Sequence, residues 1–132
     1  MANTTIVSIV DDDDAVRTAT QTFVRSLGYK TAAFASAEDF LKAPERETAA
    51  CLIVDIQMPG MSGLDLQREL AQQRPSLPII FITAFPEERI RQQAMAAGAA
   101  CLLAKPYEGD ELIEWIEKAL TGKLNGDAGA NG

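Results

Sequence analysis

The chain has 132 residues, 47% of them hydrophobic and 23% charged, which suits one domain with a hydrophobic core and is too short for two ordinary domains. A formal net charge of -7 argues against direct binding to nucleic-acid phosphates, because such binding needs clustered lysine and arginine. The chain contains no histidine, which excludes imidazole metal sites, Ser-His or Cys-His nucleophile pairs and a phosphohistidine formed on this chain.

The apolar segments are all short. Even LPIIFITAF falls well below the roughly 20 residues that span a bilayer, and the N-terminal MANTT lacks the basic region of a secretory signal. We therefore expect a cytoplasmic protein with no membrane segment.

Cys51 and Cys101 lie in apolar contexts without metal-ligand spacing, so we expect buried free thiols.

Five apolar segments alternate with five segments of helical pattern. The predicted strands are 5–10, 30–35, 50–55, 78–83 and 101–104. The predicted helices are 14–27, 36–43, 63–74, 86–98 and 109–121. Ser36 is expected to be an N-cap, because Asp39 follows three residues later in a variant of the capping box. The third and fourth strands are apolar almost throughout, which is typical of strands covered on both faces of a parallel sheet.

This alternation predicts an α/β fold, a (βα)5 doubly wound parallel sheet with helices on both faces. Among such sheets we favour the flavodoxin-like order 2-1-3-4-5. In that order the strands with Cys51 and Cys101 are about 9–10 Å apart, too far for a disulfide. Residues 1–122 are predicted to form the domain. Residues 123–132, rich in glycine and asparagine, are predicted to be a flexible tail or the start of a linker.

Polar residues cluster where the predicted strands end, which is where doubly wound sheets bind ligands. These residues are Asp11, Asp12, Asp55, Thr83 and Lys105. Crowded carboxylates require a cation, and oxygen ligands without histidine favour Mg2+ (or Mn2+). We expect Asp12 and Asp55 to bind the ion directly and Asp11 to bind it directly or through water. The backbone carbonyl of Gln57 would complete the protein ligands.

A carboxylate in such a site can act as a nucleophile toward phosphorus. The metal ion, Lys105 and Thr83 would then stabilise the phosphoryl oxygens, since positioning and charge neutralisation provide most of such catalysis. Asp13 and Asp14 are expected instead to start the following helix, because carboxylates favour helix N-termini. The four consecutive aspartates are thus predicted to serve two purposes.

The motifs VDDDD, IVDIQMPGMSGLDL, ITAF and LLAKPY occur in this order over about residues 4–121. Together they resemble the receiver domain of bacterial two-component response regulators, and most closely the FixJ type, whose receivers precede a LuxR-type helix-turn-helix domain. The resemblance implies that Asp55 is the phosphoacceptor, that Asp11 and Asp12 are the acidic pair for Mg2+, and that Thr83 is the switch hydroxyl. It also implies the family's lysine at Lys105, followed by a cis peptide bond to Pro106.

One position departs from the family pattern. Receivers usually carry Tyr or Phe three residues before the lysine, and here Leu102 occupies this switch position without a ring or a hydroxyl. Leu102 therefore places the usual coupling between Thr83 and an aromatic residue in question, but not phosphorylation. We also hypothesise that Phe85, two residues after Thr83, shields the aspartyl phosphate from water.

The resemblance implies a signalling domain that catalyses its own phosphorylation and dephosphorylation, with a sensor histidine kinase in trans as phosphodonor. Phosphorylation would alter one face of the domain, control output such as transcription and allow homodimerisation through that face. DNA would be bound only by an output domain, if one follows. The altered face would consist of the segments 86–98, 101–104 and 109–121. By family analogy the kinase would contact Ala15, Thr18, Ala19, Thr22 and the loop after residue 104.

Two other classes of protein share part of this pattern. A phosphorylation-independent interaction module, or pseudo-receiver, typically lacks one of the key residues, whereas this chain keeps all five. A phosphatase of the haloacid dehalogenase type also uses a nucleophilic aspartate and Mg2+. That class needs a second aspartate two residues after the nucleophile, and Gln57 holds this position.

Overall fold

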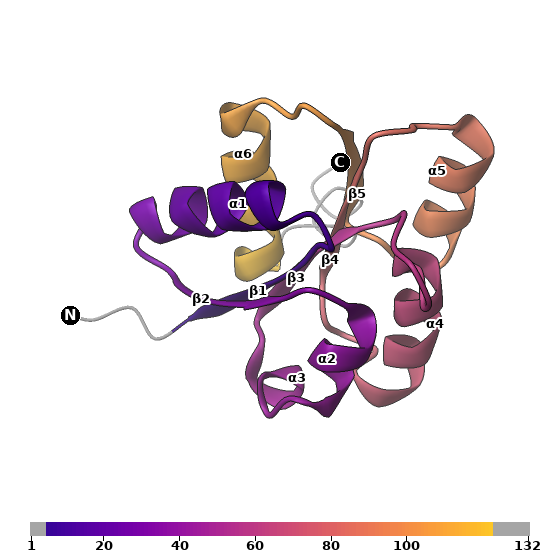
Figure 1. Cartoon of the computed structure of the whole chain (residues 1–132), viewed down its shortest axis with the longest axis horizontal. Helices are drawn as coiled ribbons and strands as arrows, with labels where there is room; N and C mark the ends of the chain where they lie inside the picture. Colours follow the sequence, from indigo (N-terminus) through magenta and orange to yellow (C-terminus); the bar gives the residue numbers. More distant parts are fainter. Residues whose placement is uncertain (1–4, 123–132) are drawn as a thin grey trace.

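The computed structural model describes residues 5–122 as an alternation of strands and helices (Figure 1). The strands are β1 Ile6–Val10, β2 Lys30–Phe34, β3 Cys51–Asp55, β4 Ile79–Thr83 and β5 Cys101–Ala104. The helices are α1 Asp14–Ser26, α2 Ala37–Lys42, α3 Glu45–Thr48, α4 Gly63–Gln73, α5 Glu88–Ala96 and α6 Gly109–Thr121. The predicted tail 123–132 lies outside the described residues.

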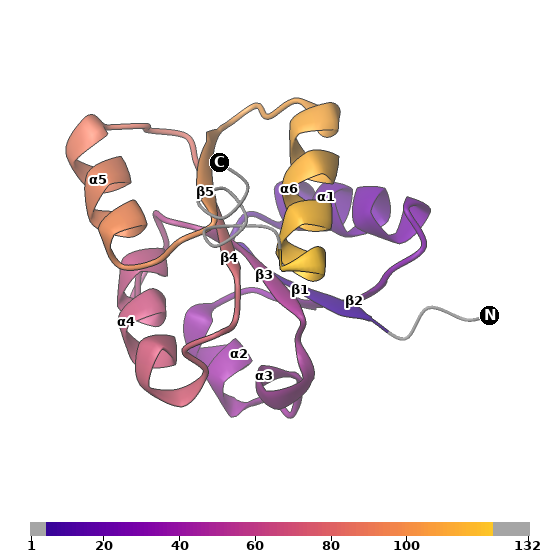
Figure 2. The same cartoon turned by 180° about the vertical axis from the view of Figure 1, so that it is seen from behind.

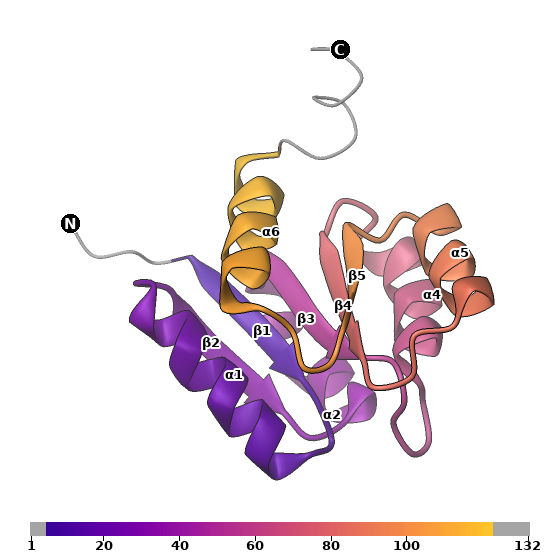
Figure 3. The ribbon, with the colours of Figure 1, turned by 90° about the horizontal axis from the view of Figure 1, so that it is seen from above.

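The five strands form one parallel sheet of order β2-β1-β3-β4-β5. Helices α1 and α6 cover one face, and α2, α4 and α5 cover the other (Figures 1 and 2). The view from above shows the strands fanning between these two helical layers (Figure 3). The predicted fold class, strand order and placement of helices on both faces are confirmed.

Two apolar clusters, one on each face, hold the helices to the sheet. On the α1 and α6 face, Ile53 and Ile80 pack with Leu112 and Ile116. The other face joins strand residues to α2, α4 and α5, with Phe81 fully buried at its centre. All residues of β3 and β4 are buried, because each of these strands has a helix layer on both sides. The carboxyl ends of β1, β3 and β4 are thereby fixed side by side.

Two helices differ most from the sequence prediction. The short helix α3 was missed, because a single turn carries no full period of apolar residues, and it follows Pro44 with no side-chain cap. Helix α5 begins at Glu88 rather than at Pro86, because Glu87 is still extended, with φ of -105° and ψ of 139°. The predicted N-cap at Ser36 is confirmed, since its hydroxyl accepts a hydrogen bond of 3.0 Å from Asp39 N.

The two cysteines are free and buried, as predicted. Burial raises the pKa of both thiols to about 12, so neither Cys51 nor Cys101 is a thiolate at neutral pH. Among residues 5–122, no helix has the length and apolar character needed to cross a membrane.

Candidate functional site

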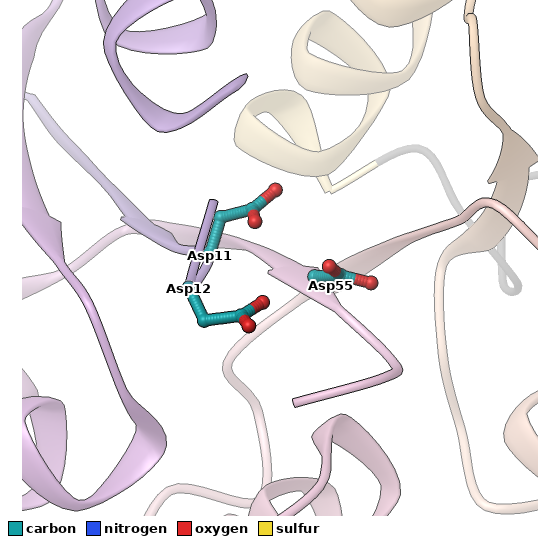
Figure 4. Close-up of side chains that lie close together, drawn as sticks. All are labelled: Asp11, Asp12 and Asp55. Atoms are coloured by element: carbon teal, nitrogen blue, oxygen red, sulfur yellow. The ribbon is translucent and has the colours of Figure 1, made fainter. Parts of the chain in front are cut away.

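Three aspartates meet at the carboxyl end of the sheet (Figure 4). Asp11 and Asp12 follow β1, and Asp55 is the last residue of β3. One carboxylate oxygen from each lies within 4.8 Å of those from the other two. Asp11 and Asp55 are buried, whereas Asp12 is exposed. The acidic group is therefore buried at Asp11 and Asp55 and open to solvent at Asp12.

The hydrogen bonds of the aspartates after β1 show that Asp11 belongs to the end of the strand and Asp13 to the start of α1. Asp11 extends the strand pairing, since its backbone N–H donates to Phe34 O at 3.1 Å, and its carboxylate accepts from Asp13 N at 2.9 Å. Asp13 caps α1 by accepting from Val16 N at 3.0 Å. The prediction that the later aspartates start the helix is confirmed: Asp13 is the N-cap and Asp14 its first residue.

Asp55 is held by the loop that follows it. Its Oδ1 accepts a hydrogen bond of 3.1 Å from Gln57 N, and its Oδ2 lies 3.1 Å from Lys105 Nζ. Oδ2 of Asp11 lies 3.3 Å from the same ammonium. The backbone N–H of Lys105 donates to Thr83 O at 2.8 Å, which anchors this loop to the end of β4. The peptide bond between Lys105 and Pro106 is cis.

The electrostatics of the site follow from burial and crowding. Burial raises the pKa of Asp55, Asp11 raises it further, and the hydrogen bond from Lys105 opposes both. Burial alone would lower the pKa of Lys105, but the hydrogen bond to Asp55 and the charges of Asp11 and Asp55 outweigh it and raise this pKa. Lys105 pairs with Asp11 and Asp55, and Asp12 adds a third carboxylate, so negative charge predominates in this group and attracts a cation. A donor set of carboxylate oxygens fits a hard divalent ion such as Mg2+.

Thr83 lies at the end of β4 and is completely buried. Its hydroxyl donates to Oε1 of Gln57 at 2.6 Å and accepts from Phe85 N at 3.0 Å. Phe85 itself is 65% exposed.

Leu102 pairs with Phe81 in the sheet and packs, partly buried, against the α2, α4 and α5 side of the core. The sequence-predicted residues thus form one group around Asp55, with Leu102 set apart in β5.

Gly63, the first residue of α4, closes tightly over the end of β3. A Cβ built on Gly63 would lie 2.7 Å from Asp55 O and 2.9 Å from Ile56 Cα, and both are backbone atoms that no rotamer change can move. We expect Gly63→Ala to destabilise the domain by about 1–3 kcal/mol, the usual cost of overpacking. Urea unfolding would measure this loss.

The matched control for that substitution is Gly109→Ala. Gly109 is also the first residue of its helix, but its Cβ would meet only ring atoms of Phe23, at 3.2 and 3.4 Å, and that side chain can move. We expect the Gly109 variant to lose clearly less stability than the Gly63 variant. Equal losses would contradict the role assigned to the backbone contact at Asp55.

Three further contacts at the site were not predicted. Gly63 could have been inferred from the second glycine of PGMSG, but the pattern does not show what it touches. Ser62 and Asp65 form a capping box that starts α4, a signal readable as S-x-x-D. Only the backbone of Gln57 was assigned a role, whereas the structure also gives its side chain a partner in Thr83.

Comparison with known proteins agrees with this geometry. A model of the response regulator receiver domain family matches residues 7–117. The response regulator protein TodT of Pseudomonas putida is 41% identical over 115 residues, which cover 87% of this chain and 51% of TodT. The transcriptional regulatory protein FixJ of Bradyrhizobium diazoefficiens is 32% identical over 114 residues, covering 86% of this chain and 56% of FixJ. The solved structure of response regulator StyR matches with a TM-score of 0.82 and 39% identity, covering 89% of this chain and 60% of the StyR chain.

The chain spans about half the length of these curated relatives. FixJ is one of several response regulators among them and is less similar to this chain than TodT is. The similarity therefore does not single out the FixJ type.

Proposed function

The chain belongs to the response regulator receiver domain family, and on that premise we propose that it takes a phosphoryl group from a histidine kinase onto Asp55. Receiver domains are signalling domains rather than classical enzymes. The observation that carries the proposal is the placement of Asp55, whose Oδ2 lies 3.1 Å from Lys105 Nζ in a group of three carboxylates. A solvated strand-end aspartate would have neither a buried carboxylate neighbour such as Asp11 nor the ammonium of Lys105.

The proposed reaction is an in-line displacement at phosphorus. A lone pair of an Asp55 carboxylate oxygen forms the new O–P bond, while the P–N bond of the kinase phosphohistidine breaks and the imidazole nitrogen keeps its electron pair. These 132 residues contain no histidine, and we propose that the phosphohistidine belongs to a separate kinase. Lys105 would neutralise charge on a phosphoryl oxygen, which its contact of 3.1 Å with Asp55 Oδ2 supports. The Thr83 hydroxyl, at the end of the neighbouring strand, would donate to another phosphoryl oxygen.

A divalent ion is part of this proposal. Asp12 and Asp55, with Asp11 directly or through water and the backbone carbonyl of Gln57, would hold Mg2+ or Mn2+. When bound, the ion would supply positive charge that offsets the crowded carboxylates and the phosphoryl oxygens. The carboxylate of Asp11 also lies 3.3 Å from Lys105 Nζ and accepts a hydrogen bond of 2.9 Å from Asp13 N.

The proposed kinase contact is the exposed surface of α1 beside the loop after β5. A surface pocket of about 480 Å³ lies there, lined by Val16, Ala19, Thr20, Lys105, Pro106 and Tyr107. Ala15, Thr18, Ala19 and Thr22 are all exposed on the adjoining helix surface. A kinase bound here would present its phosphohistidine to the lysine end of the site.

The proposed output face consists of α5, β5 and α6. These elements correspond to the segments 86–98, 101–104 and 109–121 that the sequence assigns to the face altered by phosphorylation. Phosphorylation would change this face and thereby change association with a partner or a second copy. A link to transcription is a further part of the proposal, supported by relatives such as the transcriptional regulatory protein FixJ. The FixJ-type arrangement, in which a separate output domain binds DNA, is proposed with it.

Intact mass spectrometry tests this function directly. We expect the chain to gain one phosphoryl increment when it is incubated with acetyl phosphate and Mg2+. Continuous release of inorganic phosphate from many phosphoesters per chain, without a stable increment, would indicate a phosphatase. Absence of any increment would support a phosphorylation-independent interaction module.

Phe85→Ala is expected to shorten the lifetime of the phosphorylated state several-fold. Phe85 is 65% exposed, so its ring contributes little to the core. Its backbone N–H donates to Thr83 Oγ1, so Phe85 lies beside the end of β4, where its ring would cover the phosphoryl group against water. The lifetime is measured by the decay of the phosphoryl increment after the donor is removed.

Met95→Ala is the control for Phe85→Ala. Met95 is the other large apolar side chain exposed among the described residues, at 37%, and it lies near the far end of α5. We expect its truncation to leave the lifetime unchanged. An unchanged lifetime in Phe85→Ala would rule out shielding by this ring.

A further inference from the structure

The hydroxyl of Thr83 is fully engaged in the structure. A threonine hydroxyl has one proton to donate, and Thr83 donates it to Oε1 of Gln57 at 2.6 Å. Its oxygen also accepts a hydrogen bond of 3.0 Å from Phe85 N. Thr83 itself is completely buried, whereas its two partners, Gln57 and Phe85, are exposed residues. The Gln57 side chain therefore determines where this proton points.

The carboxylate of Asp55 is satisfied without Thr83. Its Oδ1 accepts from Gln57 N and its Oδ2 pairs with Lys105. Within the described part of the chain, no hydrogen bond joins Thr83 to Asp55. Before Thr83 can donate to a phosphoryl group on Asp55, its bond to Gln57 must break. Gln57 thus contacts the phosphoacceptor through its backbone and the switch hydroxyl through its side chain.

We propose that the Gln57 side chain is a positioning residue that holds the Thr83 hydroxyl away from the phosphoryl site until Asp55 is modified. The proposal rests on the phosphoacceptor function of Asp55. Because the hydrogen bond to Gln57 must break, the affinity of the site for a phosphoryl group or its analogue is lowered about five-fold. This factor corresponds to one ordinary neutral hydrogen bond.

The loop that carries Gln57 is held by contacts that do not involve its side chain. Gly63 N donates to Ile56 O at 2.9 Å, and Met61 N donates to Oε2 of Glu38 at 3.1 Å. The Gln57 side chain is itself exposed, so an apolar replacement leaves no buried polar atom on that residue. Gln57→Met, which keeps the length of the chain but removes the acceptor, is therefore expected to fold normally.

A double-mutant cycle with beryllofluoride, a phosphoryl analogue, tests the proposal on the full chain. Fluorine NMR measures beryllofluoride affinity, in saturating Mg2+, for the wild type, Gln57→Met, Thr83→Val and the double variant. We expect Gln57→Met to bind about five-fold more tightly than the wild type, and no gain when the same change is made on the Thr83→Val background. Gln72→Met, at an exposed position of α4, should match the wild type.

The methyl resonance of Thr83 provides a second measurement, made without any ligand. In free Gln57→Met we expect this resonance to move toward its position in the beryllofluoride-bound wild type, because the hydroxyl is released. The proposal would be overturned if Gln57→Met raised beryllofluoride affinity equally on the wild-type and Thr83→Val backgrounds, or on neither. It would also be overturned if Gln57→Met raised the affinity for Mg2+ alone by the same factor. Failure of the wild type to bind beryllofluoride, or equal binding by Asp55→Asn, would instead overturn the phosphoacceptor function on which it rests.

Discussion

Replacing Asp55 with asparagine is expected to abolish incorporation of the phosphoryl group, because the amide oxygen cannot form the acyl phosphate that the carboxylate forms. The increment seen by mass spectrometry with acetyl phosphate and Mg2+ should fall below detection. The side chain keeps its size, so the end of β3 and its contact with Gly63 are retained. Loss of the increment would then reflect chemistry rather than a rearranged backbone.

The same substitution is expected to stabilise the metal-free domain at neutral pH. Burial and Asp11 raise the pKa of Asp55 above 3.8, so over the interval above 3.8 the folded domain holds a proton that the unfolded chain has released. Stability therefore falls as the pH rises through that interval, and asparagine removes this loss. Lys105 keeps a partner, since Asp11 lies 3.3 Å away. We expect thermal unfolding in chelator to show a midpoint a few degrees above that of the wild type.

Asp39→Asn is the control for both measurements. Asp39 is an exposed aspartate of α2, away from the site, and its substitution should preserve the single increment. Added Mg2+ should stabilise the wild type and Asp39→Asn, but Asp55→Asn much less, because one of its ligands is gone. An increment that persists in Asp55→Asn would show that another residue is the phosphoacceptor.

Most of the fold could be predicted because its signals are local and repeated. β3 and β4 read as continuous apolar segments, and their burial on both faces follows from that composition. The grouping of Asp11, Asp12 and Asp55 followed from topology alone, since the carboxyl ends of parallel strands meet at one edge of the sheet. The short helix α3 escaped because one turn has no periodic signal.

The parts of the site that could not be predicted depend on distances between backbone atoms and on side-chain direction. The sequence shows a glycine at position 63, but not that a methyl group there would meet Asp55 O at 2.7 Å. The spacing places Gln57 near Asp55, but whether its amide turns toward Thr83 depends on how the loop leaves β3. Residue types could thus be assigned to the site, whereas the partner of each hydrogen bond required three-dimensional coordinates.

Lys105→Met has the second large expected effect, because it removes the ammonium that pairs with Asp11 and Asp55. We expect phosphoryl incorporation to slow by roughly 10²–10³-fold, the usual cost of losing one preorganised charge partner of a reaction centre. In chelator, the domain should lose on the order of 1–3 kcal/mol of stability, since two buried carboxylates remain without their counter-charge. Incorporation kinetics and urea unfolding measure the two effects separately.

Lys118→Met is the matched control for this lysine. Lys118 forms an ion pair of 3.1 Å with Glu114 on α6, but both side chains are substantially exposed, and such pairs contribute little. Its loss should leave phosphoryl incorporation unchanged. A similar drop in both variants would mean that the effect of Lys105 comes from general charge rather than from its position.

The pH dependence of the Lys105→Met defect identifies its cause. In the wild type the hydrogen bond from Lys105 opposes the rise in the pKa of Asp55, so without the ammonium this pKa rises further. The folded variant then keeps the Asp55 proton up to a higher pH than the folded wild type does. Its free energy of unfolding therefore falls over a wider range of pH. The raised pKa of Lys105 lies above 10.5, so its own titration does not contribute between about pH 5 and pH 8. The stability difference from the wild type should therefore be larger at about pH 8 than at about pH 5. A pH-independent difference would instead indicate lost packing of the lysine side chain.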